Sequence, residues 1–105
     1  MGIERRRSPR YRLIADAEII SPSSHVCLKA RTSDLSLIGC FMNTSYSLPP
    51  GTDIQLTLKY KGATFTGIGT VARSEPSMGF GVSFGEVKGA QQILLRNWLQ
   101  GLAVR

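Results

Sequence analysis

Arginines cluster near the N-terminus in a pattern that could bind an anion. Arg6 and Arg10 form the pattern Arg-x-x-x-Arg, and Arg5 and Arg7 flank the first of them. The Ser-Pro step inside the pattern favours an extended or turning backbone over a helix, and in an extended segment Arg6 and Arg10 point to the same side. Two guanidinium groups on one side form a clamp for phosphate oxygens, and their flat faces can stack on a purine ring. By itself the pattern is also typical of a disordered basic arm.

A second group of polar residues follows in the pattern Asp-x-Ser-x-x-Gly, formed by Asp34, Ser36 and Gly39. A carboxylate can accept two hydrogen bonds at once from the N–H edge of guanine, and a serine hydroxyl can donate or accept beside it. Glycine lets the backbone approach a ligand closely or adopt a positive φ. The plainer alternative is an Asx-type turn, in which Asp34 or Ser36 bonds to its own backbone.

The elements that must position these groups are short strands, because apolar side chains alternate with polar ones along most of the chain. Turn sequences rich in Pro and Gly separate the alternating segments, and Lys61-Gly62 fits a tight hairpin. Gly67 and Gly69 suggest a bulge or a bend within a long strand. The connection at Asp34–Gly39 is expected to lie between two strands. The six predicted strands cover residues 13–19, 26–33, 40–44, 53–60, 63–73 and 78–84.

The period of the apolar residues changes near the C-terminus. From Ala90 onward the apolar residues fall on one helical stripe, with Ile93 off it. We therefore expect an all-β fold, a six-stranded antiparallel β-barrel with a C-terminal α-helix packed on it.

Charge is distributed unevenly along the 105 residues, which suffice for one domain. The formal net charge is +6, of which +4 falls in residues 1–12. We expect a basic arm at 1–12 and a single domain, barrel plus helix, at 13–105. Because the remainder is nearly neutral, the predicted partner is a small or local anion rather than a nucleic-acid duplex.

Patterns typical of catalysis or metal binding are missing from the sequence. His25 is the single histidine, the acidic residues are scattered, and no phosphate-binding glycine loop occurs. Cys27 and Cys40 lie 13 residues apart without an export signal, which predicts two reduced, half-buried thiols. No apolar run is long enough to span a bilayer. We expect a cytoplasmic binding module with no catalytic residues, no metal and no cofactor.

Together the two motifs resemble the PilZ family, whose domains bind the bacterial second messenger cyclic di-GMP. The resemblance extends to Leu-Pro-Pro-Gly at 48–51, to Thr-Val-Ala-Arg at 70–73, and to Gly-Phe-Gly-Val-Ser-Phe at 79–84. Trp98-Leu99 near the end of the predicted helix is similar as well. The resemblance implies a six-stranded barrel that holds the ligand across its outer surface.

The resemblance also implies roles for individual residues. The arginines of the arm would contact phosphates, with Arg6 and Arg10 also stacking on guanine. Asp34 and Ser36 would bond guanine edges, and Gly39 would allow close packing at the corner. The implied cyclic di-GMP-binding residues are Arg5, Arg6, Arg7, Arg10, Asp34, Ser36 and Gly39.

The leading expectation is a stand-alone receptor or adaptor that relays the ligand signal to an unidentified downstream protein. In this mechanism the arm is mobile on the nanosecond scale without ligand, and reaches the Asp34–Gly39 corner only through the ligand. A second hypothesis is a small basic barrel that binds single-stranded nucleic acid, which would need aromatic side chains on a solvent-facing surface. Most aromatic residues, Phe65 and Phe80 among them, instead occupy positions that point inward in the alternation. A third is a PilZ-like protein-interaction module that does not bind nucleotide.

Overall fold

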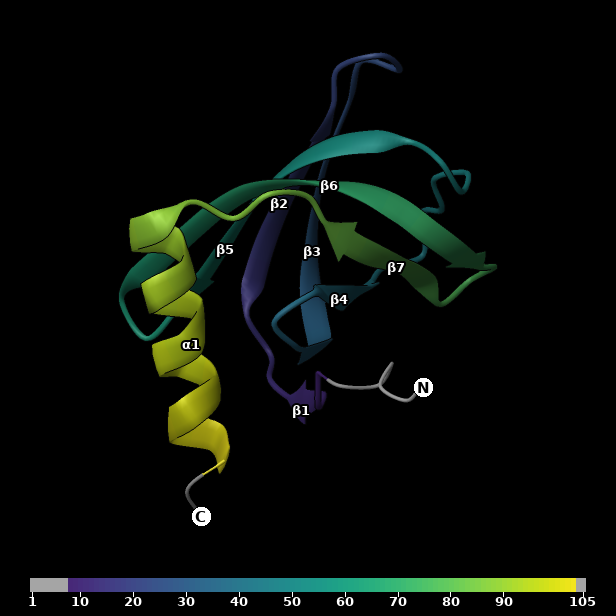
Figure 1. Cartoon of the computed structure of the whole chain (residues 1–105). Helices are drawn as coiled ribbons and strands as arrows, with labels where there is room; N and C mark the ends of the chain where they lie inside the picture. Colours follow the sequence, from purple (N-terminus) through teal and green to yellow (C-terminus); the bar gives the residue numbers. More distant parts are fainter. Residues whose placement is uncertain (1–7, 104–105) are drawn as a thin grey trace, which may run out of the picture.

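A closed antiparallel barrel of six strands, with one extra short strand and a C-terminal helix, forms the molecule (Figure 1). The structure is a computed structural model and describes residues 8–103. The strand order is β1-β3-β2-β5-β6-β7-β4, and β4 also pairs with β3, which closes the barrel. The elements are β1 (Tyr11–Arg12), β2 (Asp16–Ser21), β3 (Val26–Leu35), β4 (Gly39–Asn43), β5 (Asp53–Tyr60), β6 (Ala63–Glu75), β7 (Gly79–Phe84) and α1 (Gly89–Ala103).

The barrel interior is filled by the apolar residues that the alternation placed on one face. Each of the six barrel strands contributes at least one side chain with no exposed surface. These side chains are Ile19, Leu35, Met42, Leu58, Phe65 and Phe80. In β2, β5, β6 and β7 this side chain is at a position that the alternation placed inward, whereas in β3 the buried Leu35 lies beyond the predicted strand at 26–33.

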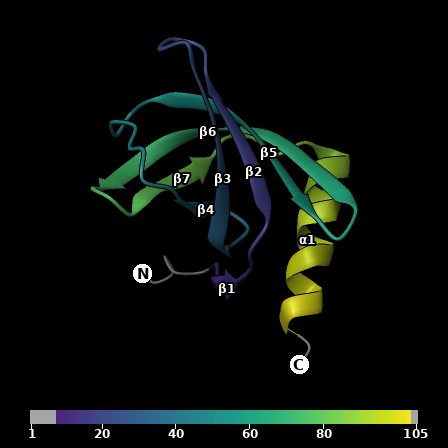
Figure 2. The same cartoon turned by 180° about the vertical axis from the view of Figure 1, so that it is seen from behind.

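Helix α1 packs its apolar stripe on β6 and reaches β1 (Figure 2). Leu95, Trp98 and Leu99 are buried, and the Trp98 ring meets the edge of Tyr60 with 5.4 Å between the ring centres. Ile93 is 62% exposed, as its place off the stripe predicted.

The predicted first strand is interrupted, and this differs from the expectation. β2 begins at Asp16 rather than Leu13, and the additional strand β1 pairs with the end of β3. Between them, the buried Thr32 hydroxyl accepts a hydrogen bond from the Ala15 amide (2.9 Å) and donates one to the Leu13 carbonyl (2.6 Å). The Thr32 hydroxyl thus supplements the backbone bonds from Leu13 to Ser33 and from Thr32 to Ala15, so alternating burial continues through a segment that is not a regular strand.

The bulge in β6 also lies elsewhere than predicted. Gly67 and Gly69 pair in regular register with Leu56 and Ile54, whereas the register shifts between Val71 and Arg73. Gly69 is needed for close approach, because a Cβ there would lie 2.8 Å from the Ser83 carbonyl oxygen.

The Lys61-Gly62 hairpin turn is confirmed, since both residues have positive φ, 50° and 79°. The two cysteines differ from the expectation of half-buried thiols. Cys27 is exposed at the start of β3, and Cys40 is buried in β4.

Candidate functional site

The two predicted motifs meet at one end of the barrel. Arg10 lies directly before β1, and its Nη1 is 3.6 Å from Oδ2 of Asp34. The expectation that the arm reaches this corner only through a ligand is therefore wrong for Arg10. Arg5, Arg6 and Arg7, and most of the arm whose mobility was predicted, lie outside the described residues.

Asp34 lies inside strand β3, which corrects the prediction of a connection at this position. It pairs with Arg12 of β1 on one side and with Phe41 of β4 on the other. The strand therefore continues to Leu35, because both neighbours provide backbone partners. The Asp34 side chain is 27% exposed, and its Oδ1 is buried and accepts no hydrogen bond from residues 8–103.

Ser36 forms the turn that was the plainer alternative for this motif. It is 2% exposed, and its Oγ accepts hydrogen bonds from the amides of Ile38 (3.1 Å) and Gly39 (3.2 Å). The same hydroxyl donates a longer bond of 3.3 Å to the Gly39 carbonyl. Ser36 therefore fixes the three-residue loop that joins β3 to β4.

Gly39 has the close-packing role that was predicted. A Cβ at this position would lie 2.1 Å from the carbonyl oxygen of Val82, so any side chain would force β4 and β7 apart. Because Gly39 has no side chain, the start of β4 and the loop after Asp34 can lie close against β7.

Arg10, Ser36 and Gly39 of the two motifs line a cavity of about 120 Å³ between the arm, the loop and strands β6 and β7, and Asp34 is connected to this cavity through its ion pair with Arg10. Ser8 and Arg10 contribute from the arm, and Ser36, Ile38 and Gly39 from the loop and the start of β4. The opposite wall was not predicted from the sequence. It consists of Ala72, Arg73, Gly81, Val82 and Ser83.

Arg73 is the functional candidate that sequence reasoning missed. Its position at the end of an alternating run gave no sign of a ligand, because the run does not reveal which strands become neighbours. The bulge after Val71 turns both Ala72 and Arg73 outward, and so places the guanidinium beside the cavity.

The electrostatics of this corner extend to the buried Cys40, which pairs with Leu35. The pKa of the Cys40 thiol is raised to about 12, chiefly by burial and in smaller part by the negative charge of Asp34, while Arg10 acts in the opposite direction. A buried thiol next to the site is thus kept protonated and unreactive.

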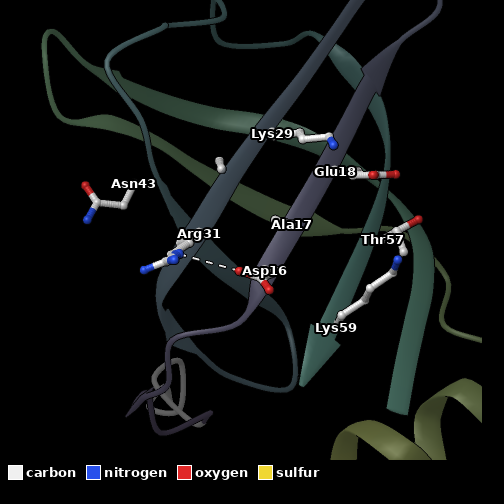
Figure 3. A pocket seen from close by; sticks show the side chains of 9 residues that line it. Asp16, Ala17, Glu18, Lys29, Arg31, Asn43, Thr57 and Lys59 are labelled. Atoms are coloured by element: carbon white, nitrogen blue, oxygen red, sulfur yellow. Dashed lines mark ion pairs between the residues drawn. The ribbon is translucent and has the colours of Figure 1, made fainter. Parts of the chain in front are cut away.

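A larger hollow of about 570 Å³ lies on the outer face of β2, β3 and β5 (Figure 3). Arg31 points toward Asp16, with 3.5 Å between Nε and Oδ1, and both side chains are more than 70% exposed. Glu18 is paired in register with Lys29, and Lys59 with Asp16. Opposite charges alternate across these strands, and the three basic side chains are largely offset by the two acidic ones, so the hollow is a solvated charged face. The smaller cavity is the better candidate because Arg10 and Arg73 line it together with Ser36 and Gly39 of the second motif.

Within residues 8–103, no cluster of three or more His, Cys, Asp or Glu side chains could hold a metal ion. Among the same residues, no helix has the length and apolar character needed to cross a membrane.

Comparison with known proteins identifies relatives of this fold. No curated protein matches the sequence. The PilZ domain of CeSA from a cellulose-synthesizing bacterium superposes with a TM-score of 0.73 at 17% identity, covering 91% of this chain and 99% of that chain. The PilZ domain of YcgR from Escherichia coli, a structure with c-di-GMP, gives a TM-score of 0.75 at 16% identity, covering 95% and 92%.

The Bacillus subtilis inhibitor of motility, MotI/DgrA, gives a TM-score of 0.76 at 16% identity. The match covers 98% of this chain and 54% of that chain, so this chain spans about half its length. At these identities the likenesses concern the fold. The PilZ domain model matches residues 4–101, and with the same barrel present in the structure, the chain belongs to the PilZ domain family.

Proposed function

We propose that this domain is a receptor for cyclic di-GMP, a ligand that carries two guanine bases and two phosphodiester groups. The observation that carries the proposal is the ion pair between Arg10 and Asp34 at 3.6 Å, which joins the two motifs beside a cavity that Arg10, Ser36 and Gly39 line. Family membership supports it, as does the related YcgR domain, whose structure is with c-di-GMP.

Asp34 is proposed to accept hydrogen bonds from the N1–H and 2-amino groups of guanine. The 3.6 Å contact with Arg10 is longer than the roughly 2.8 Å of a charge-assisted hydrogen bond. A ligand can therefore supply better donors than Arg10 does. The buried Oδ1, which has no hydrogen-bond partner among residues 8–103, would gain one in the complex.

The arginines are proposed to bind the phosphates. The Arg10 side chain is 53% exposed and can offer two parallel N–H groups to phosphate oxygens. Arg5, Arg6 and Arg7 are proposed to add contacts from the arm, with Arg6 and Arg10 stacking on guanine. Ser36 is proposed to redirect its long bond to the Gly39 carbonyl toward a guanine edge, and Gly39 to keep the corner closed.

Relay to a downstream protein is the second part of the proposal. Ser8 and Arg10 line the nucleotide cavity, whereas Pro9 and Tyr11 line a groove of about 310 Å³ against α1. The loop between β3 and β4 also contacts both sites, because Leu37 lines the groove while Ser36 and Ile38 line the cavity. A ligand that shifts the arm or the loop would therefore change the groove, where α1 contributes Arg96, Leu99 and Gln100. We propose that an unidentified partner protein recognises this change in the groove. In this proposal the domain acts in the cytoplasm and is not an enzyme.

Isothermal titration with cyclic di-GMP, GMP and a single-stranded oligonucleotide tests the proposal. Wild type should bind cyclic di-GMP specifically, and Arg10→Ala should weaken binding about tenfold or more, as loss of a charge-assisted contact does. Arg31→Ala is the matched control, because Arg31 is also exposed and pairs with an aspartate at 3.5 Å. It should bind as wild type does.

Three outcomes would contradict the proposal. Equal affinity for GMP would mean that a single nucleotide suffices. Preference for the oligonucleotide would favour a nucleic-acid-binding barrel. Absence of binding by a folded wild type would favour an interaction module that takes no nucleotide.

A further inference from the structure

Three neighbouring strands bring an arginine, a glycine and a phenylalanine into one row beside the cavity. Arg73 of β6 pairs in register with Gly81 of β7, and Gly81 with Phe41 of β4. A Cβ on Gly81 would lie 3.5 Å from Cγ of Arg73 and 3.9 Å from Cδ1 of Phe41. The two larger side chains therefore lie over Gly81, which is buried beneath them.

Arg73 is held in place from two directions. Its guanidinium carbon is 5.8 Å from the centre of the Phe41 ring, within the range of a cation–π contact. Its Nε is 3.3 Å from Oε2 of Glu75. This ion pair engages Nε rather than the terminal amino groups, and the side chain is still 55% exposed. An arginine that is ordered before binding loses less entropy when it takes a ligand.

We infer that Arg73 is a second phosphate-binding arginine and sets the preference for a dinucleotide with two phosphodiester groups. The inference rests on the proposed function and extends the same site. Arg10 and Arg73 line one cavity from different walls. A ligand with two phosphodiester groups can present one to each guanidinium group, whereas a mononucleotide has a single phosphate to share between them. Phe41 is a positioning residue, because it touches Arg73 over Gly81.

The test compares affinities for cyclic di-GMP and GMP in wild type, Arg73→Gln and Arg73→Lys. Arg73→Gln should weaken cyclic di-GMP binding tenfold or more and GMP binding less than threefold, which lowers the ratio between the two. Arg73→Lys should fail to restore the ratio, because an ammonium group lacks the planar fork and the flat face that rests on Phe41. Arg31→Gln is the matched control, because Arg31 is an exposed arginine that does not line the cavity, and it should leave both affinities unchanged.

The positioning role of Phe41 is tested separately. Phe41→Leu should weaken cyclic di-GMP binding several-fold, and Phe41→Tyr should restore it, because the aromatic ring supports the guanidinium. Thermal denaturation of each variant identifies losses that come from unfolding.

The outcomes separate this inference from the proposed function. If Arg10→Ala abolishes binding while folded Arg73→Gln stays within twofold of wild type, Arg73 is not a ligand-binding residue, and the proposed receptor function stands. An equal loss for cyclic di-GMP and GMP would refute the specificity role. A wild type that binds neither nucleotide overturns both proposals.

Discussion

Asp34 owes its position to backbone pairing on both sides rather than to a turn. Its strand is held between β1 and β4, so backbone pairing on both sides fixes the position of the carboxylate beside Arg10. A group fixed in this way can distinguish ligands that differ by one donor, because it cannot follow a poorer partner.

We predict that Asp34→Ala impairs recognition of guanine more than recognition of hypoxanthine. The inosine analogue of cyclic di-GMP lacks the 2-amino groups, so wild type should prefer the guanine ligand. The variant should bind the guanine ligand about tenfold more weakly than wild type does. Titration of both ligands measures the discrimination, with Asp16→Ala as the control on the other face. Equal discrimination in wild type and variant would mean that Asp34 does not contact the guanine edge.

Cys40 gives the barrel a predictable response to alkaline pH. Its pKa is raised in the fold from 9.0 to about 12, chiefly by burial, so the folded state favours the neutral thiol. An unfolded chain ionises this thiol from about pH 9. The stabilising contribution is therefore complete below pH 9 and is lost as pH rises toward 12. The expected loss is at most about 1.4 kcal/mol per pH unit.

Urea unfolding between pH 8 and 11 measures this slope. Cys40→Ala should be less stable at neutral pH because of the cavity it leaves, but its stability should fall less steeply with pH. Cys27→Ser changes an exposed thiol and should keep the wild-type slope. Identical slopes in Cys40→Ala and wild type would show that Cys40 does not titrate on unfolding.

At the scale of elements, the junction of β4 and β7 tolerates no side chain at Gly39. We predict that Gly39→Ala lowers the free energy of unfolding by about 1–3 kcal/mol, as overpacking against backbone does. Gly67→Ala in β6 is the matched control, because a Cβ there would lie 3.4 Å from the ring edge of Phe65, an ordinary contact distance, with no carbonyl oxygen in the way. Denaturant unfolding compares them. A neutral Gly39→Ala would mean that the strands separate without cost.

The sequence was sufficient to predict most elements, because their alternation is a local property. Which face of each strand points inward follows from the residues themselves, as does the tight turn at Lys61-Gly62. The hydrogen bonds of Thr32 could not be predicted, because its partners lie 17 and 19 residues away. The strand position of Asp34 was missed for the same reason, since it depends on pairing partners on both sides.

The sequence does not reveal which strands lie next to one another, and this was the main information missing for predicting the site. Arg73 becomes a candidate only when β6 is known to lie beside β7, and β7 beside β4, with the register shifted after Val71. Register between distant strands is set by the closed barrel as a whole. No pattern within residues 70–73 specifies this register.

At the scale of the whole molecule, alternate residues of the arm face the cavity and the α1 groove. We predict that cyclic di-GMP changes amide hydrogen exchange in the second half of α1 as well as at the cavity. The β5–β6 hairpin at Lys61-Gly62 should exchange unchanged. Arg10→Ala should abolish the change in α1 under identical conditions. Changes confined to the arm and the loop would contradict the proposed relay.

The exposed Cys27 has a practical consequence for attaching this protein to a solid support. The thiolate is the reactive species, so Cys40, with a pKa of about 12, resists a maleimide at neutral pH while Cys27 remains accessible. Cys27 is the second residue of β3 and Asp34 is near the end of this strand, seven residues on, a span of roughly 23 Å at the usual rise of a strand. Coupling through this one sulfur would fix the barrel by the end opposite its cavity. Every molecule on a sensor surface would then present the candidate site to the solution in the same orientation.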